Sequence, residues 1–305
     1  MKVRVLGSAA GGGFPQWNCN CDNCRGVRAG TIRARARTQS SIAVSSDGKS
    51  WVLFNASPDI LQQIREFPAL QPGDKLRTTG IAAIVLIDAQ VDHTTGLFML
   101  REHNRPLQLW CTEPVFQDLT TANPVLKVLG HFAGVQRHAL PLSEGGFSIP
   151  GIEGLHFEAR SLSSKAPPYS PHRDDPQPGD NIGMTITDRR SGASLFYAPG
   201  LGAIEPGVRE AMMAAQCVLV DGTCWTDDEL VRLGVSHKRA RDIGHLPQSG
   251  AGGMIEQLNA LPARTRRVLI HINNTNPILN EDGPEHRELA RHRIEVSYDG
   301  MEIEL

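Results

Sequence analysis

The sequence predicts an α/β fold in which two mixed sheets pack face to face with helices outside, an αββα sandwich. Short apolar runs that are typical of strands recur along the whole chain. Segments with helical periodicity lie between several of them, and the early part is hairpin-like whereas the later part alternates strand and helix. No stretch has the composition of an interdomain linker, so we expect residues 1–305 to form a single domain.

The expected elements follow one another in chain order. The strands, each an apolar or β-branched run, are Val3–Leu6, Ser41–Val44, Trp51–Asn55, Ile81–Ile87, Leu107–Cys111, Leu155–Ala159, Met184–Thr187, Leu195–Ala198, Cys217–Val220, Val268–Ile272 and Ile294–Ser297. The helices are Ile60–Phe67, Thr94–His103, Pro114–Leu119, Pro206–Ala215, Ala251–Leu261 and Glu285–Ala290. Ser163–Asp180 fits neither pattern, and polar, proline-rich loops of this length are usually functional lids or disordered.

Composition places the chain among ordinary globular proteins. It has 305 residues, of which 40% are hydrophobic and 21% charged, and a formal net charge of −2. The pI of about 6.6 gives no sign of nucleic-acid binding. The N-terminus lacks an apolar signal-peptide core, and no run of about eighteen apolar residues occurs, so we expect a cytoplasmic protein without a membrane segment.

The most informative stretch begins at Asp88, directly after the apolar run Ile81–Ile87, and reads Asp-Ala-Gln-Val-Asp-His-Thr-Thr-Gly-Leu. A strand that ends in closely spaced carboxylate, amide and imidazole groups directs several metal-ligand types into one pocket. His271 lies in a similar position, where an apolar strand turns into a polar loop. The glycine-rich segment Gly7–Pro15 lacks the ending of a phosphate-binding P-loop, and we expect its backbone to pass close to this pocket.

The polar stretch resembles the metal-binding loop of the metallo-β-lactamase superfamily, His-x-His-x-Asp-His-x-x-Gly-Leu, with both leading histidines replaced. The resemblance implies that Asp92, His93 and His271 bind one metal ion. Asp88 and Gln90 stand where the first-metal histidines should be, and we expect them to hydrogen-bond to the ligands or to form a weak second site. Because the family's third histidine and bridging aspartate also have no counterpart, the usual hydrolysis by a hydroxide between two zinc ions is poorly supported.

Two imidazoles and one carboxylate around one ion form the arrangement of non-haem Fe(II) oxygenases, which leaves positions open for substrate or oxygen. The same ligand atoms suit Zn²⁺, Mn²⁺ and Cu²⁺. His245 resembles the Gly-His motif of the phosphodiesterase and tRNA-processing branches, in a segment that we expect to open a helix. It is a candidate for proton transfer, with Asp221 to orient it; the alternative is that His245 only caps the helix.

The chain has 6 cysteines, and Cys19, Cys21 and Cys24 are clustered. In a reducing compartment this spacing indicates a metal site, and three thiolates can hold a structural zinc if a fourth ligand comes from elsewhere. In a related phosphodiesterase branch, a histidine three positions after the final active-site histidine closes a similar cluster. That position is Asn274 here, an uncommon zinc ligand. The alternatives for the fourth ligand are His131, His138 or another group.

Six stretches together resemble the coenzyme PQQ synthesis protein B family. They are Gly7–Cys21, Thr38–Ser41, Asn55–Asp59, Asp88–Leu97, Tyr197–Gly200 and His271–Leu279. The resemblance covers nearly the whole chain and implies a metallo-β-lactamase fold and a role in making pyrroloquinoline quinone (PQQ) from a peptide that supplies Glu and Tyr. It implies either iron-dependent hydroxylation of a tyrosine-derived PQQ precursor or a non-catalytic carrier that aids transport of PQQ or its precursor to the periplasm. A homodimer is compatible with the sequence.

Overall fold

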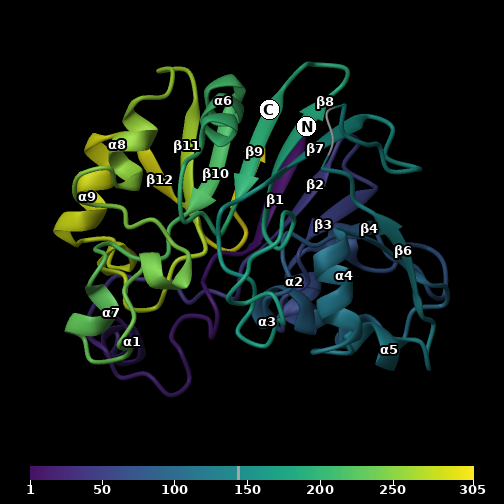
Figure 1. The fold of residues 1–305 in the computed structure, drawn as a ribbon, viewed down its shortest axis with the longest axis horizontal. Helices are drawn as coiled ribbons and strands as arrows, with labels where there is room; N and C mark the ends of the chain where they lie inside the picture. The colour runs from purple at the N-terminus through teal and green to yellow at the C-terminus, as the bar shows by residue number, and fades with distance from the viewer. Residues whose placement is uncertain (143–144) are drawn as a thin grey trace.

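The computed structural model describes residues 1–142 and 145–305, and two sheets packed face to face form its centre (Figure 1). The first sheet has the order β13 (Glu302–Glu304), β1 (Lys2–Gly7), β2 (Ser41–Ser45), β3 (Trp51–Phe54), β4 (Ile81–Val85), β5 (Leu107–Cys111) and β6 (Val135–Ala139). The second has the order β12 (Ile294–Val296), β11 (Arg266–Ile270), β10 (Cys217–Asp221), β9 (Ser194–Ala198), β8 (Ile182–Asp188) and β7 (Leu155–Ser161).

Helices lie on the outer face of each sheet (Figure 1). The α-helices are α1 (Asp22–Ala29), α2 (Ile60–Glu66), α3 (Val91–Thr94), α4 (Glu113–Thr120), α5 (Val125–Leu129), α6 (Pro206–Ala214), α7 (Glu229–Arg232), α8 (Met254–Asn259) and α9 (Pro284–Arg291). The 3₁₀ helices are η1 (Pro68–Leu70), η2 (Thr95–Leu100), η3 (Arg241–Ile243) and η4 (Pro277–Leu279). The layers are therefore helix, sheet, sheet, helix, and the predicted αββα sandwich is confirmed.

The alternation of side chains along each strand explains these layers. In β3, Val52 and Phe54 belong to the core between the sheets, whereas Trp51 and Leu53 pack with the helices α2, α4 and α5. Phe54 crosses the interface and contacts Phe157 of β7, with ring centroids 6.2 Å apart. Because both faces of the central strands are buried, those strands read in the sequence as continuous apolar runs.

Both sheets change from antiparallel to parallel pairing. The strands β3 to β6 pair parallel in the first sheet, and β9 to β12 pair parallel in the second. The carboxyl ends of parallel strands meet at one edge of a sheet, where ligand sites form in open α/β folds. The loops after β4, β10 and β11 are therefore positioned to share one site.

Several element assignments from the sequence were wrong or missing. Residues Thr94–His103 do not form one helix but continue α3 as the 3₁₀ helix η2. The segment around His245 does not open a helix, since α8 begins only at Met254. The helices α1, α5 and α7 and the strands β6 and β13 were not predicted. The helices α5 and α7 are short, α1 is mostly polar, and β6 and β13 are edge strands with polar side chains.

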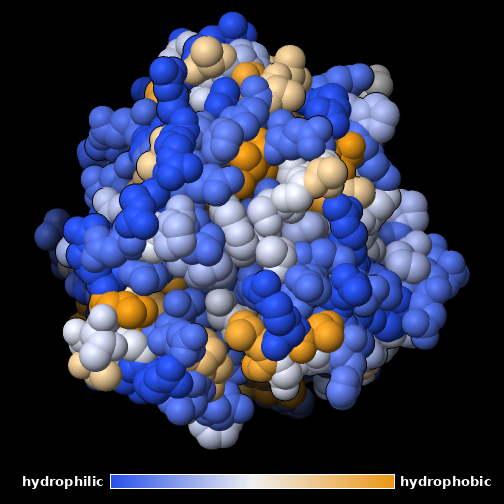
Figure 2. Space-filling view, turned by 90° about the vertical axis from the view of Figure 1, so that its left-hand side faces the viewer, coloured by the Kyte–Doolittle hydropathy of each residue, from blue (hydrophilic) through white to orange (hydrophobic). Residues whose placement is uncertain are grey.

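The outer surface beside α8 and α9 is mostly hydrophilic, with apolar side chains in small separate patches (Figure 2). In the described part of the chain, none of the helices has both the length and the apolar character needed to cross a bilayer.

Candidate metal centre

The loop after β4 is held firmly against the end of β3. Asn55, which directly follows β3, adopts the left-handed conformation with φ 65°, and its Oδ1 accepts a hydrogen bond of 3.1 Å from the backbone N–H of Ile87. Two further backbone hydrogen bonds join Ala56 N to His93 O at 2.7 Å and Gly96 N to Ala56 O at 2.9 Å. The chain from Asp88 to His93 is thereby fixed at the edge of the sheet, and its side chains need little ordering to bind a ligand.

The structure brings the three predicted metal ligands together. Asp92 Oδ2 lies 3.4 Å from His271 Nε2 and 3.8 Å from His93 Nε2, and the ligand atoms all lie within 4.8 Å of one another. Ligand atoms about 2.1 Å from a shared ion are separated by roughly 3.0–3.4 Å in octahedral or tetrahedral geometry. The observed spacing is close to these values, so these three side chains could hold one ion.

The other ring nitrogen of each histidine is already engaged. His93 Nδ1 contacts both carboxylate oxygens of Asp88 at 2.8 and 2.9 Å, and His271 Nδ1 lies 2.9 Å from Thr223 Oγ1. These contacts fix the ring orientations and leave Nε2 to face the shared centre. His93 Nε2 is buried and has no hydrogen-bond partner in the described part of the chain. A buried orphaned nitrogen next to two other ligand-type atoms fits a metal site.

His271 has an unusual backbone. It directly follows β11 and adopts φ 60°, a left-handed conformation that costs a residue other than glycine on the order of 1 kcal/mol. Hydrogen bonds on both sides hold it there, from Gly222 N to Ile270 O at 2.7 Å and from Thr223 Oγ1 to the carbonyl of His271 at 3.0 Å. The turn directs the imidazole away from the sheet and towards Asp92.

His245 lies beside the three ligands and is held by Asp221, the last residue of β10. Its Nδ1 is 2.6 Å from Asp221 Oδ2, and its ring stacks on that of His271 with centroids 5.3 Å apart. His245 follows Gly244, the left-handed end of the short helix η3, so the reading of His245 as a helix cap is wrong. The structure thus brings the second predicted pair, His245 and Asp221, to the same centre as the metal ligands.

Thr223 is a functional candidate that the sequence reasoning missed. Its hydroxyl lies 2.7 Å from Asp221 Oδ1, 3.1 Å from His245 Nδ1 and 2.9 Å from His271 Nδ1. It therefore links the residue pair to the ligand set. The available signal was its place directly after a strand in the sequence Asp-Gly-Thr, since polar residues at the carboxyl ends of parallel strands are often part of a site.

The charges of the centre stabilise one another. Burial by itself raises the pKa of Asp92, but the positive charges of His93 and His271 outweigh it and hold that pKa far below its usual value. Burial lowers the pKa of His93, yet Asp88 and Asp92 raise it to about 9. Likewise, burial lowers the pKa of His245, and the Asp221 carboxylate raises it above its ordinary value. In the absence of metal, the carboxylates thus favour protonated imidazoles.

A hollow of about 310 Å³ opens in front of these groups. Gln90 lines it, and its backbone N–H donates to Asp88 Oδ1 at 2.8 Å. Gly11 of the glycine-rich segment also lines it, and a Cβ at that position would lie 3.2 Å from Asp92 Oδ2. The prediction that this segment passes close to the pocket is confirmed. The sequence reasoning did not assign Arg173 and Lys238, two cationic side chains in the lining.

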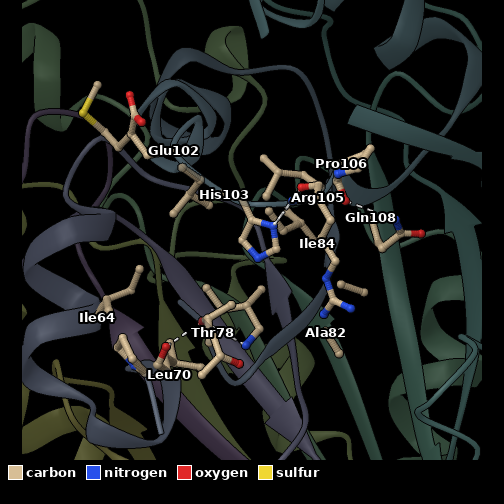
Figure 3. A pocket seen from close by; sticks show the side chains of 17 residues that line it. Ile64, Leu70, Thr78, Ala82, Ile84, Glu102, His103, Arg105, Pro106 and Gln108 are labelled. Carbon is tan, nitrogen blue, oxygen red and sulfur yellow. Dashed lines mark hydrogen bonds between the residues drawn. The ribbon is translucent and has the colours of Figure 1, made fainter. Parts of the chain in front are cut away.

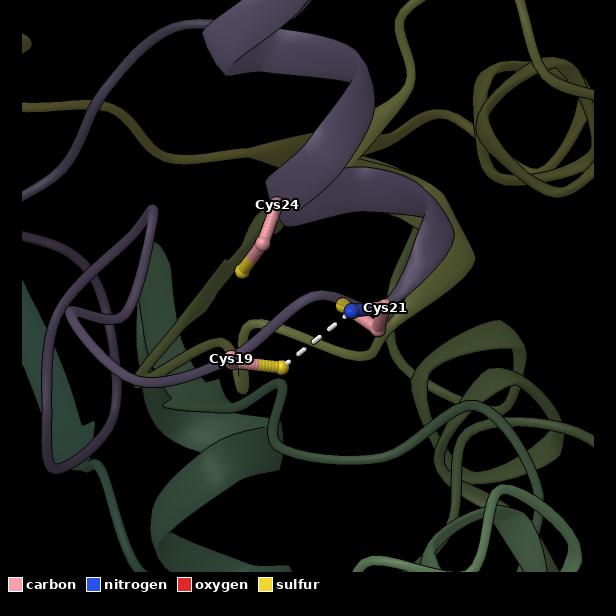
Figure 4. A group of neighbouring side chains, drawn as sticks. All are labelled: Cys19, Cys21 and Cys24. Atoms are coloured by element: carbon pink, nitrogen blue, oxygen red, sulfur yellow. Dashed lines mark hydrogen bonds between the residues drawn. The ribbon is translucent and has the colours of Figure 1, made fainter.

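The three clustered cysteines form a second group of ligand atoms (Figure 4). Cys19 and Cys21 precede α1 and Cys24 lies in its first turn, and their sulfurs lie within 4.8 Å of one another. The side-chain amide of Asn274 is among them, with its nitrogen 3.0 Å from Cys19 Sγ and 3.4 Å from Cys24 Sγ. Asn274 therefore occupies the place expected of a fourth ligand.

The histidine alternatives for the fourth ligand are wrong. His138 lies on β6, where its ring stacks on Trp110 at 3.9 Å between centroids and its Nε2 contacts Gln108. Among the described residues, neither His138 nor His131 joins the group of sulfur atoms.

An apolar hollow of about 230 Å³ lies at the opposite ends of β4 and β5 (Figure 3). Its walls include Ile64, Leu70 and Ile84. His103 also lines it, and its Nδ1 is hydrogen-bonded to the backbone carbonyl of Arg105. The wall residues belong to none of the ligand groups described above.

Comparisons with known proteins agree with this fold. Residues 50–272 match the model of the β-lactamase superfamily domain. Coenzyme PQQ synthesis protein B of Azoarcus sp. (strain BH72) is 68% identical, and that of Methylococcus capsulatus is 62% identical, each over the whole of both chains. The crystal structure of Zn²⁺-bound PqqB from Methylobacterium extorquens is similar with a TM-score of 0.92 and 38% identity over both full chains. A diphosphatase of the PhnP family, 18% identical with a TM-score of 0.68, covers 100% of this chain and 97% of its own, and shares the fold.

Proposed function

The chain belongs to the coenzyme PQQ synthesis protein B family, and on that premise we propose that it acts in PQQ biosynthesis. We propose more specifically that it is a metal-dependent hydroxylase of a tyrosine-derived PQQ precursor. One observation carries this proposal: Asp92, His93 and His271 converge on one point, and the hollow of about 310 Å³ lies beside them. Two imidazoles and a carboxylate on one side of an ion leave its other side to the reactants.

The position of Asp88 argues against a hydrolase with two zinc ions. Both its oxygens contact His93 Nδ1, so this carboxylate supports a ligand of the first centre. A ferrous ion held by the three ligands would supply the redox chemistry that a hydroxylation with dioxygen and an external electron donor requires. A zinc ion, as in the relative from Methylobacterium extorquens, fits the same atoms but has no redox chemistry.

His245 is suited to move a proton at this centre. Asp221 holds its Nδ1, which leaves Nε2 as the proton-exchanging atom on the side of the hollow. In its neutral form His245 can accept the proton of a phenol at that nitrogen, and in its protonated form, which Asp221 stabilises, it can donate one to a reacting oxygen. Asp221 is itself held by the backbone N–H of Leu201 at 2.8 Å, so it orients His245 and stays ionised.

We also propose that the thiol cluster holds a structural zinc. Sulfur atoms at about 2.3 Å from a tetrahedral zinc lie roughly 3.8 Å apart, compatible with the spacing of Cys19, Cys21 and Cys24. Asn274 closes the fourth side. Because Asn274 lies in the loop that begins at His271, the zinc would fix that loop and, through it, a ligand of the reactive metal.

The decisive test is reconstitution of the full-length protein with Fe(II) under anaerobic conditions. On addition of O₂, a tyrosine-derived precursor and a reductant, we expect oxygen uptake and a product heavier by oxygen. Protein loaded with Zn(II) is the redox-silent control. A carrier would bind PQQ or the precursor without oxygen uptake, and His93→Ala would leave its affinity intact; that result would reject the hydroxylase.

A further inference from the structure

A second hollow of about 470 Å³ adjoins the metal pocket. The two hollows share Ser164, and the neighbouring residues Gly244 and His245 line one hollow each. The long loop between β7 and β8, which the sequence marked only as polar and rich in proline, contributes walls to both. It supplies Ser164 and Arg173 to the metal pocket and Lys165 to the second hollow.

The second hollow has a positive lining. Lys165 and Arg241 lie in its wall, and among the described residues no carboxylate lines it. Arg173 and Lys238 occupy the metal pocket. In the part of the chain that the structure describes, none of these four side chains forms an ion pair, although most other arginines near the ligand clusters do. Unpaired cations at the rim of a pocket attract anions.

The loop between β7 and β8, which carries Lys165 and Arg173, is anchored by hydrogen bonds at several points. Asn181 Nδ2 donates to the carbonyl of Lys165 at 3.2 Å, and Leu162 N donates to the carbonyl of Asn181 at 2.9 Å. Arg173 donates to the carbonyl of Ala166. Gly244, with φ 89°, lets the opposite wall approach, because a Cβ there would clash with the Ser164 hydroxyl. The backbone that carries Lys165 and Arg173 therefore has a defined position beside the metal pocket.

We propose that the second hollow is a carboxylate subsite: Lys165 and Arg241 bind one carboxylate of a substrate whose reacting ring lies at the metal, while Arg173 and Lys238 meet another. This inference rests on the proposed function and adds the residues that would bind the carboxylates of its substrate. The metal pocket itself contains Asp88 and Asp92, whose two negative charges would only be balanced by one divalent ion, so the centre offers little net positive charge to such an anion. Cations on the flanks supply that charge and also favour one direction of substrate entry.

The test uses full-length protein loaded with Zn(II), so that binding is measured without turnover. The probe is PQQ, a planar tricarboxylate, titrated by calorimetry at low salt. We expect the double variant Lys165→Gln/Arg241→Gln to bind PQQ about tenfold more weakly, with the loss shrinking at high salt. The charge-preserving variant Lys165→Arg/Arg241→Lys should keep most of the affinity.

The matched control is Lys127→Gln/Arg291→Gln, which removes the same charges from α5 and α9. Zinc content and thermal midpoint should be unchanged in all three variants, since the substituted side chains are exposed. The trimethyl ester of PQQ, which lacks the charges, should bind wild type and the double variant equally. Equal weakening in the control, an unchanged affinity in the double variant, or no binding of PQQ to wild type would each overturn the subsite.

The failure of this proposal can be told from failure of the proposed function. Oxygen uptake with an unchanged KM in the double variant would reject the subsite and leave the hydroxylase standing. PQQ binding that depends on Lys165 and Arg241, without oxygen uptake by the iron-loaded protein, would reject the hydroxylase and leave the subsite.

Discussion

Two of the ligand groups that the described residues form, the one around Asp92 and the one around Cys19, differ in enclosure. The first group, Asp92, His93 and His271, lies beside a hollow. The Nδ1 atoms of its two histidines are hydrogen-bonded to neighbouring side chains. The cysteines at the start of α1 surround one point, and Asn274 closes the remaining side. Structural metal sites are closed by protein ligands, whereas reactive sites keep a position open. The comparison therefore supports the proposal of a reaction at the first group and of a bracing role for the second.

The two groups are also mechanically linked. The loop after β11 carries His271 and, three residues later, Asn274. The side chain of Asn23 in α1 donates to the carbonyls of Asn274 and Asn276 at 3.1 and 2.8 Å. Disturbing the thiol cluster should thus reach the reactive centre indirectly, whereas the reverse effect should be small.

The largest expected effect comes from His93→Ala. It removes one ligand and leaves Asp88 and Asp92 without their cation, so the reactive metal should be lost and oxygen uptake should fall by about a thousandfold or more. Elemental analysis should still find the zinc of the thiol cluster. His138→Ala, on β6, is the control and should keep both metals. Full turnover by the His93 variant would contradict the proposal that the reactive metal lies in the group of Asp92, His93 and His271 and not in the thiol cluster.

Cys24→Ser should mainly affect stability. The side chain is fully buried, and removing a ligand of a structural ion loosens the contact between α1 and the loop after β11. We expect loss of the structural zinc and a thermal midpoint lower by about 5 °C or more, with a smaller loss of activity than in the His93 variant. Differential scanning calorimetry and zinc analysis measure both. Cys111→Ala, a buried thiol of β5, should keep the zinc; equal zinc loss there would contradict the assignment.

Asp88→Asn tests the support of His93. The amide keeps the shape but loses the charge that faces Nδ1, so we expect the affinity of the reactive centre for metal to fall about 10–100-fold. Competition with a chelator measures it. Asp118→Asn is the control. That carboxylate accepts a hydrogen bond of 2.8 Å from Ser170 and does not line the metal pocket. If both variants bind metal as wild type does, Asp88 has no supporting role.

Metal binding at the first group should release a proton. Burial lowers the pKa of His93, but Asp88 and Asp92 raise it to about 9, above the unfolded value of 6.5. The charged form therefore stabilises the metal-free fold below about pH 6.5, and that contribution is lost as the pH rises through 9. A metal ion needs the neutral imidazole. At pH 7.5 we expect release of about one proton and an affinity that increases up to pH 9, measured by calorimetry in buffers of different ionisation enthalpy. No dependence on the buffer would contradict this.

The smallest effect is expected from Asn274→Ala. An amide is a weak zinc ligand, so its loss should lower the zinc affinity of the thiol cluster only a few-fold. Asn274→His should instead raise that affinity, because an imidazole binds zinc better. A zinc chelation assay compares the two. An unchanged affinity in both variants would show that Asn274 does not close the site.

The sequence predicted much of the fold because most strands are buried on both faces. Runs such as Cys217–Val220 and Leu195–Ala198 have no polar position to obscure them. The edge strands β6 and β13 were not predicted from the sequence because half of their side chains face outward. Helix boundaries near Thr94 were wrong since hydrogen bonds to Ala56, a distant residue in the chain, set the local geometry.

The candidate site was predicted unevenly for a similar reason. The types and order of side chains in the chain were enough to propose the groups around Asp92 and Cys19, because ligand chemistry is a property of the residue itself. The sequence could not show that Thr223 bridges two histidines or that the loop before β8 brings Lys165 beside the metal pocket. These relations depend on contacts between segments far apart in the chain, and only the packing of the two sheets brings those segments together.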